Sequence, residues 1–249
     1  MSTFQIFTAD QIASIRRGGA ILRACLELVA SRVRAGTTTK ALDDAAEEFI
    51  CSHPGAKPAF KGYRGYPATL CTSVNEQCVH GIPGPRVLRD GDIVSLDSGV
   101  IFDGLYTDAC ITVPVGQVSP DVLNFLDVTQ QALDDACAIV RAVIRVGDIS
   151  STIQKTVEDA GYNCVHGLTG HGLGNSLHQF PDIPNTGRRG TGPVLPPMTL
   201  IAIEPITAMG RGDMLQEDDG WTIRTQDRSI SGHFEHTLLV TEQGCEVMA

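Results

Sequence analysis

The sequence predicts an α+β fold of two related halves, each with two helices followed by an antiparallel sheet. A long helix, a glycine and a short helix occur in this order twice, and strand-like sequence follows each pair. Residues 33–48 also align with residues 144–159 at a constant shift, so that Arg34 matches Arg145 and Glu47 matches Glu158. We therefore expect a single domain over residues 1–249, with halves of approximately 1–118 and 119–249.

The first predicted helix begins near Ile12 and ends at Gly36. Thr8 and Gln11 form a capping-box pattern ahead of apolar residues at helical spacing, and a glycine commonly ends a helix. A shorter helix is expected over residues 39–50, before the sequence HPG.

The second helix pair has equally clear signals. Ser119 is a suitable N-cap and Pro120 suits the first helical position, so a long helix is expected from there to Gly147. A shorter helix follows over residues 150–160. The strand-like segments of the two halves are residues 92–102, 105–115, 199–208, 220–225 and 234–241.

The composition argues against several classes of protein. The formal charge is −10 without any run of Lys or Arg, which argues against a nucleic-acid surface. No stretch of about 18 apolar residues is present, so no membrane span is expected. The eight cysteines include no CxxC pair, which excludes a zinc ribbon and is typical of buried thiols in a reducing compartment. We expect a soluble cytoplasmic protein.

The segment VSLDSGVIFDGLYTDA, residues 94–109, holds three carboxylates in otherwise apolar sequence. Asp103-Gly104 is a strong two-residue hairpin turn, and this register places Gly99 opposite Asp108 and Asp97 opposite Cys110. Asp97 and Asp108 then share a face, roughly 7–8 Å apart between backbones. Two such carboxylates repel each other unless a proton or cation lies between them. The alternative is that one of them faces solvent at a strand edge.

Further polar residues favour a bound cation over the alternative of a solvent-facing carboxylate. Glu204 interrupts an apolar run before Pro205, and Glu235 opens another strand-like run. His171 lies in the glycine-rich segment GHGLGNSLH. A single His is more often a hydrogen-bonded structural residue than a ligand, but one His with four carboxylates fits a two-metal site rich in oxygen ligands. Such a site suits divalent Mn, Fe or Co.

The order Asp97, Asp108, His171, Glu204, Glu235 resembles the ligand series of the pita-bread metallopeptidases. The flanking sequences VHGIPG, GHGLG, IEPI, DGWTIRTQDRSISGHFEHT and VTEQGCEV are specifically similar to type I methionine aminopeptidases of the bacterial kind. The similarity covers nearly the whole chain, and the doubled helix pattern matches the pseudo-twofold halves of that fold. It implies one catalytic domain with the metal site between the halves.

The resemblance implies two divalent ions per chain, chosen among cobalt, manganese, iron, zinc and nickel. Asp97 would bind one ion, His171 and Glu204 the other, and Asp108 and Glu235 both. A hydroxide activated by the two ions would attack the first peptide bond. Glu204 would relay its proton, as a catalytic residue.

His80 and His178 are the other catalytic residues that the resemblance implies. They would contact the substrate, hydrogen-bond the scissile amide and stabilise the tetrahedral intermediate.

The resemblance also implies a methionine pocket, formed by Phe60, Tyr63, Tyr66, Cys71, Leu177 and Trp221. A monovalent-cation site would involve Asn75, Gln77 and Ser231. Three residues depart from the common family pattern, namely Phe60, Leu177 and Gln179. They bear on the shape of the pocket and on side-chain preference, while the metal ligands are all present.

The expected activity is removal of the initiator methionine from nascent polypeptides, with small second residues preferred. Nascent chains are the expected partners, the ribosome is a candidate partner, and a monomer is expected. Two alternatives remain at this point: a Pro-directed peptidase on the same fold, and a metal-free peptide-binding module.

Overall fold

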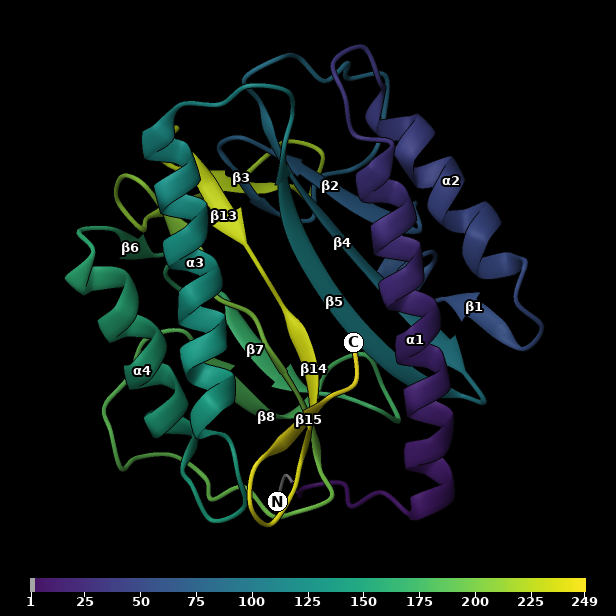
Figure 1. Cartoon of the computed structure of the whole chain (residues 1–249), viewed down its shortest axis with the longest axis vertical. Helices are drawn as coiled ribbons and strands as arrows, with labels where there is room; N and C mark the ends of the chain where they lie inside the picture. Colours follow the sequence, from purple (N-terminus) through teal and green to yellow (C-terminus); the bar gives the residue numbers. More distant parts are fainter. Residues whose placement is uncertain (1–2) are drawn as a thin grey trace.

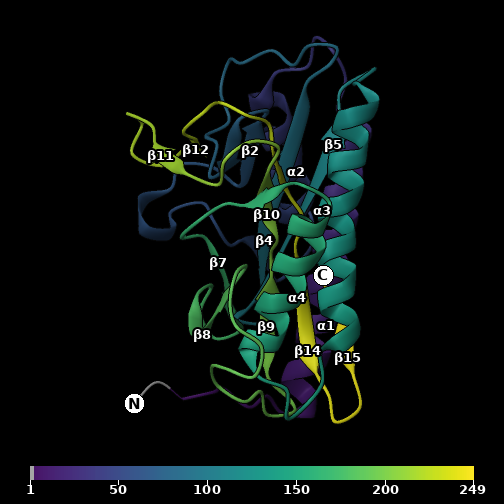
Figure 2. The ribbon, with the colours of Figure 1, turned by 90° about the vertical axis from the view of Figure 1, so that its left-hand side faces the viewer.

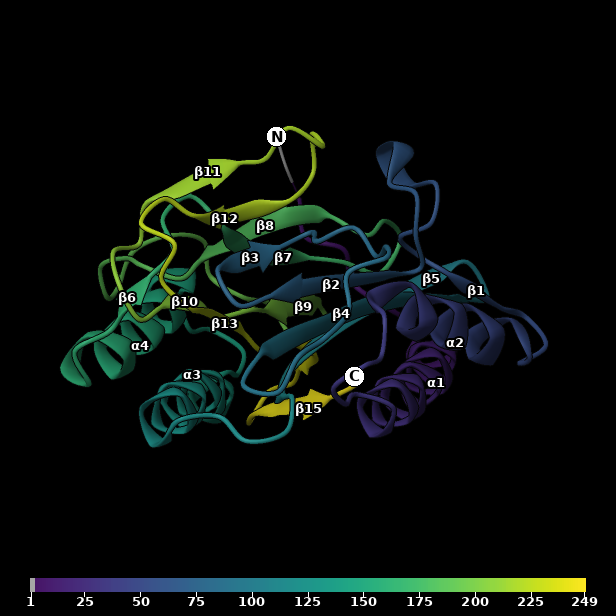
Figure 3. The same cartoon turned by 90° about the horizontal axis from the view of Figure 1, so that it is seen from above.

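Four helices lie on one side of a layer of antiparallel strands. Figure 1 shows one helix pair at each side of the molecule, and Figures 2 and 3 show all four helices against the same face of the strands. The computed structural model describes residues 3–249. The helices are α1 (Ala9–Ser31), α2 (Thr39–Cys51), α3 (Pro120–Ile139) and α4 (Val146–Asp159), with a short 3-10 turn, η1, at Tyr63–Gly65. The α+β class expected from the sequence is confirmed.

The strands of the first half centre on a long hairpin, β4 and β5. Strand β4 pairs with β1, β2 and β5, all antiparallel. The first-half strands are β1 (Ala56–Pro58), β2 (Leu70–Val74), β3 (Gln77–Val79), β4 (Ile93–Phe102) and β5 (Leu105–Pro114).

The second half is built mainly on a five-stranded sheet in the order β15-β14-β9-β7-β8. Its strands are β6 (Asn163–Cys164), β7 (Thr169–Gly172), β8 (Gln179–Pro184), β9 (Leu200–Ile203), β10 (Ile206–Ala208), β11 (Met214–Gln216), β12 (Ile223–Thr225), β13 (Ser231–His233), β14 (His236–Val240) and β15 (Cys245–Val247). Strand β3 pairs with β12, and β5 meets the segment between β13 and β14 through the bridge Cys110–Glu235. The two halves therefore share hydrogen bonds at their junction.

Each helix pair covers its own apolar core. Leu22 of α1 and Leu42 of α2 are fully buried in a cluster with Leu96 of β4, whereas Phe125 of α3 and Ile153 of α4 belong to a second cluster. Each such side chain stabilises the fold by about 2 kcal/mol through removal of apolar surface from water. The two cores hold the central strands from the helical side and leave their opposite side for the functional site.

Two predicted helix ends were wrong. The capping box of Thr8 and Gln11 is present, but α1 ends at Ser31. The N–H groups of Arg32 and Val33 donate three residues back, to Val29 O and Ala30 O, and the Gly36 N–H donates outside the helix, to Leu88 O at 2.9 Å. The long helix α3 ends at Ile139, well before Gly147, which lies inside α4. A Cβ at Gly147 would lie 2.3 Å from Arg188 O, so this glycine permits close backbone packing and does not end a helix.

The predicted strands are mostly confirmed with shorter bounds. The expected strand over residues 199–208 divides into β9 and β10 at Glu204 and Pro205, because proline has no N–H for a sheet. Residues 220–225 and 234–241 contribute only the short strands β12 and β14. No helix within residues 3–249 is both long and apolar enough to cross a membrane.

Candidate metal centre

The β4–β5 hairpin positions Asp97 and Asp108 as the sequence predicts. Asp97 pairs with Cys110 and Gly99 pairs with Asp108, and the turn residues Asp103 and Gly104 both have positive φ angles, of 50° and 76°. Asp97 is 8% exposed and Asp108 is 4% exposed. The alternative that one of them faces solvent is therefore wrong.

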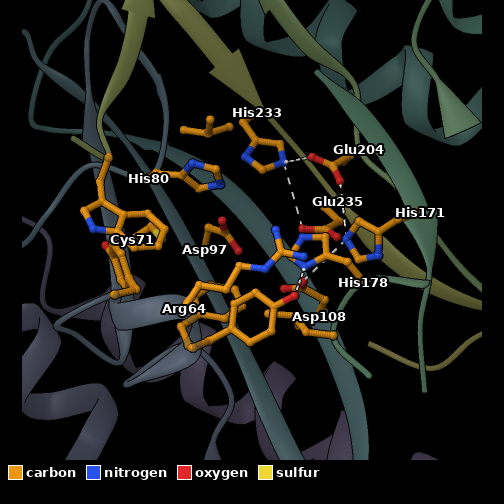
Figure 4. Close-up of a pocket in the computed structure, with 16 residues that line it drawn as sticks. Arg64, Cys71, His80, Asp97, Asp108, His171, His178, Glu204, His233 and Glu235 are labelled. Carbon is orange, nitrogen blue, oxygen red and sulfur yellow. Dashed lines mark hydrogen bonds and ion pairs between the residues drawn. The ribbon is translucent and has the colours of Figure 1, made fainter. Parts of the chain in front are cut away.

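Three further side chains converge on these carboxylates from the second half. His171 lies on β7, Glu204 follows β9, and Glu235 lies between β13 and β14. His171 Nε2 is 3.9 Å from Asp108 Oδ2 and 3.6 Å from Glu204 Oε1. Asp108, His171 and Glu235 each offer a ligand atom within 4.8 Å of the others. Figure 4 shows all five side chains directed into one pocket.

Burial raises the pKa of all four carboxyl groups. The pKa of Asp97 rises to about 7 through desolvation, and burial followed by neighbouring carboxylates raises the pKa of Asp108 and Glu235 well above the ordinary value. The pKa of Glu204 rises for the same reasons. Burial lowers the pKa of His171 to about 4, so its imidazole is neutral and able to bind a metal.

Two observations indicate that this site fits divalent cations. One oxygen each of Asp97, Asp108 and Glu235 is buried without a hydrogen-bond partner among residues 3–249, which is costly unless a cation binds it. The donor set of carboxylates and imidazole is the set that such cations prefer.

His178 and His80 lie at the mouth of this cluster. The ring of His178 is 4.2 Å from that of His171, and its Nδ1 is 3.1 Å from the Tyr63 hydroxyl. Burial lowers the pKa of His178 to about 3 and lowers that of His80. His80 has a φ of 60°, and its ring lies 6.3 Å from that of Trp221 in a T-shaped arrangement. Both imidazoles are therefore neutral hydrogen-bonding groups beside the carboxylates.

The six residues predicted for the apolar pocket are also brought together. Phe60, Tyr66, Cys71 and Leu177 form one buried cluster, with Tyr63 and Trp221 packed against it. Cys71 on β2 pairs directly with Asp97 on β4, so the pocket adjoins the carboxylates. Gln179, by contrast, starts β8 and accepts a hydrogen bond from the Ser176 N–H at 3.3 Å, outside the pocket lining.

The residues predicted for a monovalent cation meet near β3. The Ser231 N–H donates to Asn75 O at 2.8 Å, and the side-chain oxygen of Gln77 accepts from the Val74 N–H at 2.9 Å. The side-chain oxygen of Asn75 accepts from the Ile93 N–H. A monovalent cation there stays a prediction.

The pocket contains three residues that the sequence reasoning missed: Arg64, Val79 and His233. His233 is 2% exposed, and burial lowers its pKa to about 3. A signal for it existed, because His233 precedes Glu235 by two residues and such residues in extended chain point to the same face.

Comparison with known proteins agrees with this geometry. Residues 13–242 match the model of metallopeptidase family M24. A methionine aminopeptidase of Clostridium perfringens is 42% identical over 239 residues, with 96% of each chain covered. Methionine aminopeptidase 1 of Bacillus subtilis is 39% identical, with 97% of each covered.

Solved structures give the same result. The crystal structure of methionine aminopeptidase from Rickettsia prowazekii has a TM-score of 0.96 at 37% identity, covering 99% of both chains. A prolidase from Pyrococcus furiosus shares the fold with a TM-score of 0.80, but at 19% identity and with only 64% of its own chain covered. The chain therefore belongs to metallopeptidase family M24 and, within it, to the methionine aminopeptidases.

Proposed function

We propose that this chain removes the initiator methionine from nascent proteins and peptides in a reaction that depends on two divalent ions, with small second residues preferred. The observation that supports it most is the buried set of four carboxylates and one neutral imidazole beside an apolar pocket. The ligands would be Asp97, Asp108, His171, Glu204 and Glu235. Divalent ions bound there would supply Lewis acidity, which polarises the scissile carbonyl and acidifies a water molecule.

The apolar cluster would hold the methionine side chain. Cys71 offers a polarisable sulfur, and the rings of Phe60, Tyr66 and Trp221 offer faces and edges that suit a thioether. Phe60 and Leu177 are both buried in this cluster, so their departures from the common family pattern act on the shape of the pocket.

His80, His178 and Glu204 would act on the peptide bond. As neutral imidazoles, His80 and His178 can donate a hydrogen bond to the scissile amide and to the oxygen on which negative charge develops. Asp97, Asp108 and Glu235 are buried, whereas the Glu204 side chain is 13% exposed, so Glu204 is the most open of the four carboxylates. A carboxylate oxygen that faces the substrate can accept a proton and return it to the leaving amine.

We infer one catalytic domain over residues 1–249 with halves near 1–118 and 119–249, a cytoplasmic monomer, nascent chains as substrates and the ribosome as a candidate partner. The acidic charge of −10 without a basic run supports the absence of nucleic-acid recognition.

A peptide series with each divalent ion added to metal-free protein tests the proposal. We expect methionine release from Met-Ala peptides, less from peptides with large second residues, and none from Asp97→Ala with any ion added. Full activity of Asp97→Ala would refute the two-metal reaction. Cleavage of X-Pro peptides without methionine preference would indicate a Pro-directed peptidase, and failure to bind any divalent ion would indicate a peptide-binding module.

A further inference from the structure

His233 enters the metal centre from a rigidly held backbone. Its N–H donates to the Thr112 hydroxyl at 3.0 Å, and the same hydroxyl donates to His233 O at 2.6 Å. This reciprocal pair ties the end of β13 to β5. The ring is thereby directed into the pocket, beside Glu204 and Glu235 (Figure 4).

The His233 ring is buried without hydrogen bonds. It is 2% exposed, and neither Nδ1 nor Nε2 has a partner within residues 3–249. A structural histidine normally satisfies at least one nitrogen, because an unpaired buried polar atom costs about 1–3 kcal/mol. His236, three residues further on, meets this expectation, since its Nδ1 lies 3.0 Å from Ala249 O.

The spacing of His233 from the carboxylates matches that of His171. Nε2 of His233 is 3.7 Å from Glu204 Oε2 and 3.9 Å from Glu235 Oε2, while Nε2 of His171 is 3.6 Å from Glu204 Oε1. These distances are too long for hydrogen bonds. Two ligands each about 2.1 Å from one ion lie about 3.0–4.2 Å apart, depending on the angle between them. Glu204 therefore lies between two imidazoles, one facing each oxygen.

We propose that His233 is a further ligand of the metal centre and binds, through Nε2, the ion shared by Glu204 and Glu235. The inference rests on the proposed function and adds a sixth residue to its ligand set. A second imidazole shifts the preference of an oxygen-rich site toward Co, Ni and Zn relative to Mn and Mg. His233 would then be a determinant of which ion the protein selects.

Metal binding by His233→Gln tests this, with His236→Gln as the matched control on the same segment. Glutamine keeps an N–H donor near Nε2 but removes the imidazole nitrogen. Titration of metal-free protein with Co(II) should show at least about tenfold weaker binding for His233→Gln, because even a residue that only orients a ligand costs about 10–100-fold. The loss for Mn(II) should be smaller, and His236→Gln should match the parent.

Pulsed electron paramagnetic resonance with one equivalent of Mn(II) gives a readout independent of activity. The parent should show two coordinated imidazole nitrogens and His233→Gln one. A single nitrogen in both proteins, or unchanged Co(II) affinity, would overturn the assignment and leave His233 as a hydrogen-bond donor. If the parent releases methionine while showing one nitrogen, only this inference fails; if it binds no divalent ion, the proposed function fails as well.

Discussion

Thr237→Val should destabilise the junction that carries Asp108. The Thr237 side chain is fully buried on β14, and its hydroxyl accepts from the Asp108 N–H at 2.9 Å and donates to Asp108 O at 2.7 Å. Valine has nearly the same shape but leaves both backbone groups unpaired. At about 1–3 kcal/mol for each buried unpaired group, with partial relaxation, the free energy of unfolding should fall by about 2–4 kcal/mol.

Thr72→Val is the matched control. Thr72 lies on β2, is 2% exposed, and its hydroxyl has no partner in the described part of the chain. Removing that hydroxyl should be neutral or stabilising by up to about 1 kcal/mol. Thr237→Ser keeps the hydroxyl and should lose only about 1 kcal/mol for the buried methyl group. Urea unfolding of all variants in EDTA measures the differences. If Thr237→Val costs no more than Thr72→Val, the hydroxyl does not hold Asp108 and the reasoning is refuted.

Three further predictions concern the carboxylates and the pocket. In metal-free protein the pKa of Asp97 rises from 3.8 to about 7, so the folded state keeps a proton that the unfolded chain releases, and stability falls as pH rises through this window. Asp97→Asn should exceed the parent by about 4 kcal/mol in urea unfolding near pH 8 and equal it near pH 3, below both pKa values. Asp43 is buried and accepts hydrogen bonds from the N–H groups of Thr69 and Leu70 at 2.9 and 3.0 Å, so Asp43→Ala should lower the free energy of unfolding by about 2–4 kcal/mol. Asp44 is exposed, and Asp44→Ala should lower it by under about 0.5 kcal/mol. Equal losses in thermal unfolding would contradict this. Leu177→Ala removes an apolar contact of the pocket and should lower kcat/KM for Met-Ala peptides about tenfold, mainly through KM, and an unchanged value would remove Leu177 from the substrate contacts.

The hairpin that carries Asp97 and Asp108 was predictable because its register depends on adjacent residues. A two-residue turn at Asp103-Gly104 fixes which residues face each other, and the alternation of side chains then fixes the shared face. The far end of α3 was not predictable in the same way. Gly147 has the local signal of a helix end, but its actual role is to admit Arg188 O, a contact made by a residue distant in sequence.

The proposed ligands of the second half could not be placed from the sequence either, because their positions also depend on contacts between distant residues. Glu204 and Glu235 could be noticed as charges in apolar runs, but nothing local shows that the chain brings them to Asp108. The spacing of His233 and Glu235 indicates a shared face, but it does not indicate that this face is buried. The meaning of His233 depends on both ring nitrogens being buried without partners, which only the folded chain shows.

At the junction of the halves, two threonines stand at the same spacing from a polar residue of the site, and this pattern is visible in the sequence. Thr112 follows Asp108 by four residues on β5, and Thr237 follows His233 by four residues in the segment that runs from β13 into β14. The Thr112 hydroxyl accepts from the His233 N–H and donates to His233 O, and the Thr237 hydroxyl makes the same two bonds with Asp108. The two pairs lie on either side of the bridge between Cys110 and Glu235. Side-chain hydroxyls thus take the place of regular ladder bonds on both sides of this bridge, and Asp108, His233 and Glu235 face one pocket from the two segments.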